Sequence, residues 1–335
     1  MLLNTRKKYN AAMVQLASVN GVETVSTQFN VLPSIQQKLE EKIQESSAFL
    51  SLINVFLVEQ MSGERIGMGI SGPIASRTNT DKEDRQTNDP TTLDSRKYLL
   101  QETDFNTHIK YSKLDQWAKF QDFYVRFRSV IVQRQALDRI MIGFNGVKIA
   151  EKTDIFANPM LQDVNKGWLQ KQREENPQRI LSSGATVGKI TVGKNGDFKN
   201  LDALVMNITD EFIAPWHQNA DLVVICSRKL QSDKYFPLVN KDQENTEKLA
   251  ADIIISQKRM GNLPVYAVPF FPEDALLVTT FDNLSIYVQE GARRRTIIDN
   301  AKRKRIENYE SSNEDYMIED LELCAMAEKI EILSE

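Results

Sequence analysis

One segment of the 335-residue sequence, residues 62–98, constrains the fold more than any other. It is rich in glycine, serine, threonine, asparagine and aspartate, and Leu93 is the only large aliphatic residue between Ser76 and Arg96. A stretch of this composition cannot bury enough apolar surface to fold on itself. It is also too long to be an ordinary connecting loop inside a compact domain.

The two ends of this segment indicate a β-hairpin. Apolar and polar residues alternate over 65–70, and a strand-like run returns over 97–100. The residues between these runs are mostly polar, so the hairpin has a polar tip. Because an isolated two-stranded hairpin is only marginally stable in water, we expect this one to lie on another molecule.

Two short amphipathic helices are predicted at the N-terminus, over residues 5–18 and 34–49. Pro33 and Ser34 open the second helix, and Gln37 completes the spacing of a capping box. The polar linker 24–30 separates the helices, which indicates an arm that needs a partner to bury its apolar stripes. These stripes consist of Tyr9, Met13 and Leu16 in the first helix and of Ile35, Leu39 and Ile43 in the second.

A long helical pattern covers residues 113–143, and Gly143 and Gly146 end it. At 1.5 Å per residue, about 30 residues of helix span roughly 45 Å, which is as wide as a small domain. We therefore expect a single spine helix. The residues expected to face the core are Leu114, Trp117, Tyr124, Phe127 and Ile131.

The middle of the chain predicts a compact α/β domain. A helix is expected over 201–213 with Asn200 as its cap, and a buried strand over 222–226. A short helix over 229–235 is expected to end at Pro237.

After Leu284 the pattern changes to strands. These runs should form a sheet that packs on the spine helix. They cover residues 285–288, 296–298, 305–309, 316–318 and 321–332.

Composition and residue counts exclude several functions. The net charge of −4 argues against a dedicated nucleic-acid binder, which usually carries a basic excess. Cys226 and Cys324 each lie in an apolar run and are expected to be buried thiols, without a disulfide framework. His108 and His217 are the only histidines, so no zinc-binding spacing exists, and His217 is expected to be structural. We expect no metal and no cofactor.

Neither a signal peptide nor an apolar run of the ~20 residues that a membrane span needs is visible, so no contact with a membrane is expected.

Residues 188–194 raise an alternative function. Gly188, Gly193 and Lys194 fit the first seven positions of a phosphate-binding loop, but the eighth position is Asn195 instead of Ser or Thr. Residues 190–192 read as a strand, whereas a phosphate-binding loop leads directly into a helix. A phosphate- or nucleotide-binding enzyme that uses Gly188 to Lys194 is therefore the alternative to a structural protein.

Charge is segregated near the C-terminus. Seven basic residues fall within 293–305, and nine acidic residues fall within 310–335. The two blocks can pair within one subunit or between neighbouring subunits, or form solvated faces, and the basic block can also face nucleic-acid phosphates. The charged residues expected to contact another subunit are Arg65, Arg77, Lys82, Asp84, Arg85, Arg96, Arg293, Arg294 and Arg295.

Segments along nearly the whole chain resemble one protein family. The most specific are Leu201-Asp-Ala-Leu-Val-Met, Asp233-Lys-Tyr-Phe-Pro-Leu-Val-Asn and Ile255-Ser-Gln-Lys-Arg-Met-Gly-Asn-Leu-Pro. Thr5-Arg-Lys-Lys-Tyr-Asn-Ala and Asp282-Asn-Leu-Ser-Ile-Tyr extend the match toward both ends. In this order, the segments resemble the major capsid proteins of P2-like tailed bacteriophages, a branch of the Hong Kong 97 capsid fold.

The resemblance implies an α+β subunit with four parts. These are an N-terminal arm (1–54), an E-loop hairpin (55–106), a peripheral domain with the spine helix (107–160 and 285–335) and an axial α/β domain (161–284). It also implies a structural protein, not an enzyme, that self-assembles as hexamers and pentamers into an icosahedral head shell around double-stranded DNA.

The family implies several partners. They are a scaffolding protein, a maturation protease, a portal protein and packaged DNA held by non-specific contact. A cut within roughly the first 35 residues is expected, because nicking concentrates in exposed polar linkers such as 24–30. The expected location is the virion, after assembly in the bacterial cytoplasm. No motif here supports the covalent crosslinks of some relatives. Another structural component of the same virion is a further alternative.

Overall fold

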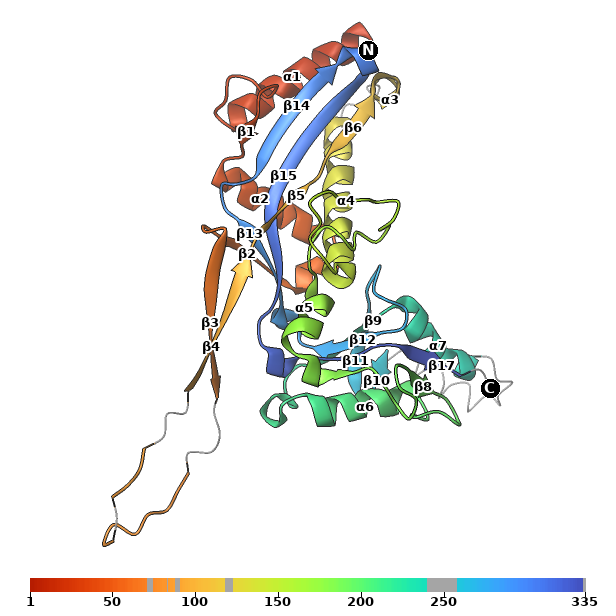
Figure 1. The fold of residues 1–335 in the computed structure, drawn as a ribbon. Helices are drawn as coiled ribbons and strands as arrows, with labels where there is room; N and C mark the ends of the chain where they lie inside the picture. Colours follow the sequence, from red (N-terminus) through yellow and green to blue (C-terminus); the bar gives the residue numbers. More distant parts are fainter. Residues whose placement is uncertain (71–74, 83, 88–90, 118–122, 240–257, 334–335) are drawn as a thin grey trace.

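The computed structural model describes residues 1–70, 75–82, 84–87, 91–117, 123–239 and 258–333. The described chain forms two bodies and a projecting hairpin (Figure 1). The upper body holds the N-terminal helices and a long twisted sheet, and the lower body holds a second sheet flanked by helices. The hairpin of β3 (Ser62–Ile70) and β4 (Thr91–Leu99) extends away from both. This α+β architecture agrees with the predicted fold class.

Seven strands of the described chain form the sheet of the upper body, with β15 at its centre. The strands are β1 (Phe29–Asn30), β2 (Asn54–Val58), β5 (Gln101–Asp104), β6 (Thr107–Lys110), β13 (Leu284–Gln289), β14 (Arg294–Asn300) and β15 (Arg305–Ile318). The sequence predicted two short strands within 305–318, but β15 runs unbroken for 14 residues. It continues because Glu310, Ser312 and Glu314 are buried with hydrogen-bond partners.

The N-terminal arm packs on this sheet. Its helices are α1 (Leu3–Val19) and α2 (Pro33–Glu45). The expectation that the arm needs a partner is wrong for much of its apolar surface, because Ala17, Val25 and Phe29 are buried against Ile297 and Ile306 of the same chain. The predicted capping box of α2 is also absent: Leu32 is the N-cap and makes no side-chain hydrogen bond.

The expected spine helix is described as two helices, α3 (Tyr111–Trp117) and α4 (Phe123–Asn145). Of the predicted core residues, Leu114 is buried and Ile131 is half-buried, but Trp117 is 40% exposed. Tyr124 and Phe127 belong to α4, but their side chains lie outside what the structure describes. The buried face of α4 lies nearer its C-terminal end, where the helix contacts the rest of the body. It consists of Val132, Ala136, Ile140, Met141, Ile142 and Phe144.

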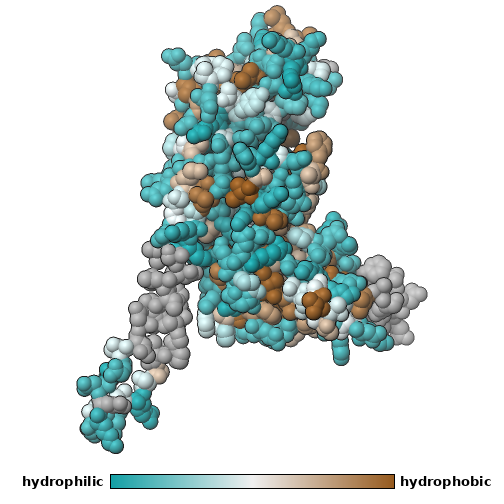
Figure 2. Space-filling view, in the orientation of Figure 1, coloured by the Kyte–Doolittle hydropathy of each residue, from teal (hydrophilic) through white to brown (hydrophobic). Residues whose placement is uncertain are grey.

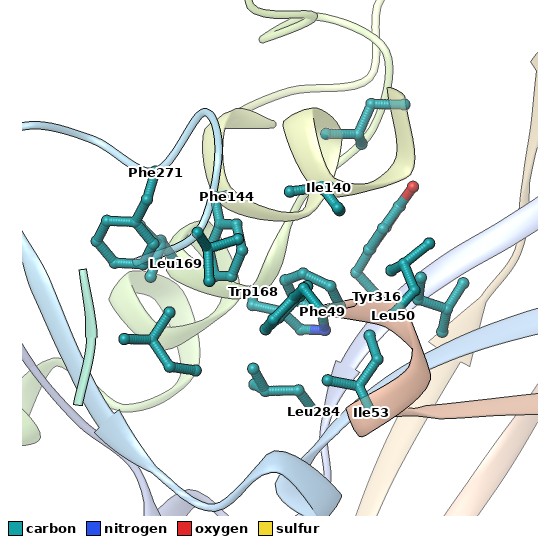
Figure 3. Packing of buried hydrophobic residues seen from close by; sticks show 14 of the residues in the cluster. Phe49, Leu50, Ile53, Ile140, Phe144, Trp168, Leu169, Phe271, Leu284 and Tyr316 are labelled. Carbon is teal, nitrogen blue, oxygen red and sulfur yellow. The ribbon is translucent and has the colours of Figure 1, made fainter. Parts of the chain in front are cut away.

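Trp168, the first residue of α5 (Trp168–Glu175), lies in the apolar cluster to which both bodies contribute residues (Figure 3). Its ring is fully buried and lies 5.1 Å from the Phe144 ring and 5.3 Å from the Tyr316 ring, centroid to centroid. Its indole nitrogen donates to the Ser285 carbonyl at 3.1 Å. A Cβ atom at Gly143 would lie 2.2 Å from the Trp168 ring, so only glycine permits this close packing.

The lower body is built on a six-stranded sheet, as far as the structure describes it. Its strands are β7 (Ile180–Leu181), β9 (Val223–Cys226), β10 (Arg259–Met260), β11 (Leu263–Ala267), β12 (Leu276–Thr279) and β16 (Ala325–Ala327), and β8 (Ile190–Val192) pairs separately with β17 (Ile330–Ile332). The helices are α6 (Leu201–Phe212) and α7 (Arg228–Val239). The described residues of the two bodies also form the short 3₁₀ helices η1 (Leu50–Leu52), η2 (Pro177–Arg179), η3 (Pro215–His217), η4 (Phe281–Asn283), η5 (Ala301–Arg303) and η6 (Leu321–Leu323).

Two predictions for this body are confirmed and two are wrong. The Asn200 side chain caps α6 by accepting from the Ala203 amide, and every residue of β9 is buried. Pro237 does not end α7, which continues to Val239. Residues 321–332 do not join the sheet on the spine: β16 pairs with β12 and β7. All three residues of β16 are buried, as suits an interior strand covered on both faces.

Five ionised side chains meet in the interior of the upper body. Glu40 of α2 accepts hydrogen bonds from Arg139 of α4 at 2.6 Å and from Arg293 at 2.7 Å. Arg139 also donates to Glu314 at 2.6 Å, and Arg293 donates to Glu310 at 2.7 Å. All five side chains are at most 5% exposed. This network joins the arm, the spine and the central strand.

The arginine charges lower the pKa of two acids of the network, Glu40 and Glu310. Burial by itself would raise the pKa of Glu310, but the charges of Arg293 and Arg295 outweigh it and hold that pKa at about 2. Burial likewise opposes ionisation of Glu40, yet Arg139 and Arg293 bring its pKa below the ordinary value. Loss of one partner would therefore leave a buried charge without compensation.

We expect Arg139→Met to lower the free energy of unfolding by about 3–5 kcal/mol, because Glu314 would lose its arginine and Glu40 would lose one of its two. Urea unfolding followed by circular dichroism measures this change. The matched control is Arg294→Met, since Arg294 is 51% exposed and pairs with Glu102 at 3.6 Å. The control should lose less than about 1 kcal/mol. Equal losses for the two variants would contradict the role of the network.

The network also predicts a loss of stability in acid. The pKa of Glu310 is about 2 in the folded chain and 4.5 ordinarily, so the unfolded chain takes up the proton first as the pH falls. The stabilisation is thus complete above a pH of about 4.5 and is lost as the pH falls toward about 2. Urea midpoints measured across this window should fall. Glu310→Gln should weaken the pH dependence, and an unchanged slope would refute the assignment.

Candidate assembly surface

The predicted hairpin is confirmed. β3 and β4 pair antiparallel from Ser62 opposite Leu99 to Ile70 opposite Thr91. Within the described chain, no third strand pairs with them. Figure 1 shows the hairpin extending well beyond both bodies. A strand pair in this position leaves the hydrogen-bonding groups of its edges unpaired unless another molecule covers them.

Two arginines fasten the base of the hairpin to the body. The Arg65 guanidinium pairs with the Glu319 carboxylate and donates to the Glu319 carbonyl. Arg96 donates to the same carbonyl and lies 3.3 Å from the Glu175 carboxylate. The sequence predicted that Arg65 and Arg96 contact another subunit, but both are engaged within their own chain.

Aromatic packing completes this attachment. The Tyr287 ring lies 5.2 Å from Tyr98 and 5.6 Å from Phe56, centroid to centroid. Its hydroxyl donates to Glu319 at 3.2 Å, and burial, followed by the Glu319 charge, raises the pKa of Tyr287 to about 12. Leu100, directly after β4, is fully buried. The hairpin therefore leaves the body from a defined base.

The tip of the hairpin is hydrophilic. Arg77, Lys82, Asp84 and Arg85 are all exposed there, and Figure 2 shows the described part of this end covered by hydrophilic residues. The Lys82 amide donates to the Asn79 carbonyl at 3.0 Å, which closes the turn. These four residues remain the predicted contacts with another subunit.

The basic block near the C-terminus is divided by the fold. Arg293 is fully buried in the charge network, so it is part of the chain's own core instead of a surface contact. Arg295 donates to the Asn308 side chain at 2.7 Å, whereas Arg294 is largely exposed. Lys302, Arg303 and Lys304 are exposed at the turn between β14 and β15, and Arg305, the first residue of β15, donates to Glu307 at 2.6 Å.

Sequence reasoning missed the acidic partners of these arginines. Glu40 and Glu319 look like ordinary surface residues in the sequence, because isolated charges in amphipathic or mixed segments are usually solvated. One weak indication of buried acids was present in the sequence, because the acidic residues of 310–315 lie between two predicted strands. No local pattern shows that Arg139 reaches both Glu40 and Glu314, since these residues are far apart in the chain.

Residues 188–194 do not form a phosphate-binding loop. They contain the strand β8, which turns back through Gly196 and does not lead into a helix. The Asp197 carboxylate accepts from the Thr191 hydroxyl at 2.6 Å, the Ala185 amide at 2.7 Å and the Thr191 amide at 2.8 Å. These bonds, the Thr191 hydroxyl first, lower the pKa of Asp197 to about 2. A fixed carboxylate at this turn would repel a phosphate.

The reactive residue types occupy structural positions. Cys226 and Cys324 are buried, as predicted, and burial raises the pKa of each thiol to about 12. His217 lies in η3, with its Nε2 3.1 Å from Asp320. His217, Asp320 and Glu322 are the one three-residue group in the described chain whose ligand atoms all lie within 4.8 Å of each other. No described helix is long and apolar enough to cross a membrane.

Comparison with known proteins gives a consistent result. A family model described as "Phage major capsid protein, P2 family" matches residues 8–330. The chain is 51% identical to the capsid proteins of Escherichia phage P2, over 99% of this chain and 96% of that protein. It is 37% identical to the major capsid protein of Serratia phage KSP20, over 94% of this chain and 93% of that protein.

Solved structures extend this similarity to the fold. A chain of the satellite phage P4 procapsid, which includes the size determination (Sid) protein, superposes with a TM-score of 0.80 and 48% identity, covering 99% of each chain. A chain of the cyanophage A-1(L) capsid superposes with a TM-score of 0.52 and 12% identity, over 96% of this chain and 99% of that one. The second similarity concerns the fold alone.

We expect replacement of both base arginines, Arg65→Ala with Arg96→Ala, to loosen the hairpin without unfolding the body, because the bonds to Glu319 are lost while the cores remain. Hydrogen–deuterium exchange at β3 and β4 should become faster by roughly tenfold or more. The matched control is Arg77→Ala at the tip, which should leave exchange at the base unchanged. Unaltered protection in the double variant would mean that these arginines do not hold the hairpin.

Proposed function

Because the chain belongs to the P2 family of phage major capsid proteins, we propose that its β3–β4 hairpin joins neighbouring copies within the shell. The chain is a major capsid subunit with the Hong Kong 97 fold, and copies of it form the procapsid shell of a tailed phage. It is accordingly a component of the virion. The alternative of a phosphate-binding enzyme is not favoured.

The observation that carries the proposal is the contrast between the two bodies and the hairpin. The bodies have continuous apolar cores, and the network of Glu40, Arg139 and Arg293 ties the upper one together. The hairpin has a fastened base but projects away from both bodies. Since such a strand pair is marginal by itself, contact with another copy is the arrangement that stabilises it.

The proposed function assigns a role to each of the four parts of the chain. Residues 1–54 act as the arm and residues 55–106 as the E-loop, with β2 and β5 contributing to the central sheet. Residues 107–160 and 285–318 act as the peripheral domain. Residues 161–284 act as the axial domain, to which 319–333 also belong, because β16 and β17 pair with strands of the lower body.

We further propose the partners of a shell subunit. Copies assemble as hexamers and pentamers in the cytoplasm of the bacterial host, with a scaffolding protein and a portal protein. Exposed residues at 23–24 and 26–28 supply a site for a maturation protease. The exposed turn of Lys302, Arg303 and Lys304 suits non-specific contact with packaged double-stranded DNA. The chain itself has no catalytic role.

Deletion of residues 78–90 tests the function of the hairpin. We expect the variant to remain folded, because the described apolar cores contain no residue of this range, and to form no closed shells. Circular dichroism measures folding, and electron microscopy of cells that express the scaffold measures shells. Lys194→Ala is the control and should assemble normally, since Lys194 lies in the turn after β8 and not in the hairpin. Intact particles from the deletion variant would refute the proposal.

A further inference from the structure

Three side chains that can ligate a metal ion meet where the chain crosses from the upper body to the lower body. His217 is the last residue of η3, and Asp320 and Glu322 lie at the start of η6. The strand β15 of the upper body ends at Ile318, and β16 of the lower body begins at Ala325. No spacing in the sequence predicts this group, because His217 is far from the two acids in the chain.

The fold positions these side chains by itself. Asn283, which is 3% exposed, accepts from the Asp320 amide at 2.6 Å and donates to the Asp320 carbonyl at 2.8 Å. The Oδ1 atom of Asp320 accepts from the Glu322 amide at 2.8 Å, which leaves its Oδ2 facing His217. The Ala214 amide donates to the Glu322 carbonyl at 3.2 Å and so joins η3 to η6. The three ligands are therefore held together before any ion binds.

The contact between His217 and Asp320 needs a positively charged partner between its two atoms. The Nε2 of His217 lies 3.1 Å from the Oδ2 of Asp320. Both atoms carry lone pairs, so either a proton or a metal ion must lie between them. Two ligands at about 2.0–2.1 Å from a tetrahedral zinc ion lie roughly 3.4 Å apart. A zinc ion can thus replace the proton with little movement of either side chain.

The charges around the group also favour a dication. Two carboxylates face one imidazole, and Arg179 lies 4.0 Å from Glu322 while it also donates to the Phe212 carbonyl. The side chains of His217, Asp320 and Glu322 are 26%, 42% and 45% exposed. Water can therefore reach the group and complete the coordination of an ion. The exposed Glu322 side chain is also free to turn toward it.

The donor atoms identify the kind of ion. Calcium and magnesium prefer ligand sets made of oxygen alone, whereas zinc and similar transition metals accept histidine nitrogen together with carboxylate oxygen. We propose that His217, Asp320 and Glu322 bind a transition-metal dication of the zinc class. Water occupies the remaining coordination position.

The ion ties the crossing segment (319–324) to η3 of the lower body. Glu319, the residue before Asp320, is the one that holds Arg65 and Arg96 at the base of the hairpin. An ion on Asp320 thus steadies both the junction of the bodies and the base of the hairpin. Because the ion binds the folded chain and not the unfolded one, it stabilises the fold by mass action.

Zn²⁺ binding to the full-length chain tests the site. The protein is dialysed against a chelator, exchanged into plain buffer and titrated with Zn²⁺ alone by isothermal titration calorimetry. We expect one bound ion per chain. His217→Ala and Glu322→Gln should each weaken this binding by at least roughly 100-fold, because loss of a ligand costs more than the 10–100-fold that loss of an outer hydrogen-bond partner costs.

Matched controls separate this site from general binding to the surface. His108→Ala removes the other histidine, which is exposed on β6, and Glu211→Gln removes an exposed carboxylate of α6. Both controls should bind Zn²⁺ as the wild type does. Circular dichroism shows whether each variant is folded. Glu322→Gln is nearly isosteric and changes a side chain that is 45% exposed, so it keeps the test valid if His217→Ala disturbs the fold.

Trp216 supplies a second readout. Its ring lies 6.2 Å from the His217 ring, centroid to centroid, and it is 54% exposed. Co²⁺, which takes the same ligands as zinc, quenches the fluorescence of a nearby indole. We expect Co²⁺ to quench the fluorescence of the wild type and excess Zn²⁺ to restore it. Trp216→Phe should lose most of this response and still bind Zn²⁺ in the calorimeter.

A thermal measurement checks the effect on stability. Zn²⁺ at about 100 times its dissociation constant should raise the melting temperature of the wild type by roughly 3 °C or more, and should leave that of Glu322→Gln unchanged. An equal rise in both proteins would count against the clamp.

Three results would overturn the proposal. The first is a wild type that binds no Zn²⁺. The second is Zn²⁺ binding that His217→Ala and Glu322→Gln leave unchanged, or that His108→Ala weakens equally. The third is a site that prefers Mg²⁺ and does not respond to His217→Ala, which would make it an oxygen-only site.

Discussion

Two arginines and three glutamates share the interior of the upper body, at most 5% exposed to water. Each arginine contacts two carboxylates, and Glu40 contacts both arginines, so Glu40 links the Arg139–Glu314 pair to the Arg293–Glu310 pair. The arm helix must therefore dock on both the spine and the segment of Arg293 before the network is complete. Buried ion pairs of this kind add less to stability than apolar packing would, but breaking one is costly. We infer that this network enforces one arrangement of the arm on the sheet.

A rigid upper body matters because the hairpin is attached to it. Arg65 and Arg96 hold the hairpin to Glu319, and Glu319 directly follows β15, the strand that carries Glu310 and Glu314. β15 therefore has two roles. The buried charges fix its position, and the residue that follows it fixes the direction in which the hairpin leaves the body. Small differences at this base are amplified at the tip, because the strand pair is long. A subunit that must meet identical neighbours needs such control over direction.

The hairpin tip carries exposed charges of both signs, with Arg77, Lys82 and Arg85 beside Asp81 and Asp84. No described strand pairs with the hairpin, so one chain by itself leaves its edges uncovered. In the proposed shell, other copies of the chain cover these edges and pair with these charges.

Local signals were enough to predict the hairpin, the cap at Asn200 and the buried strand β9, because each depends on residues that are neighbours in the chain. The ordered family segments predicted the capsid fold. The sequence could not show that Arg293 is a core residue, that β15 continues through Glu310 to Glu314, or that β16 belongs to the lower body. In each case the deciding partner is distant in sequence: Glu40 for Arg293, Arg139 for Glu314 and β12 for β16. From the sequence, a charged residue is expected to be exposed to solvent. Only the tertiary structure shows that a distant residue of opposite charge is buried beside it, which allows both to lie in the interior.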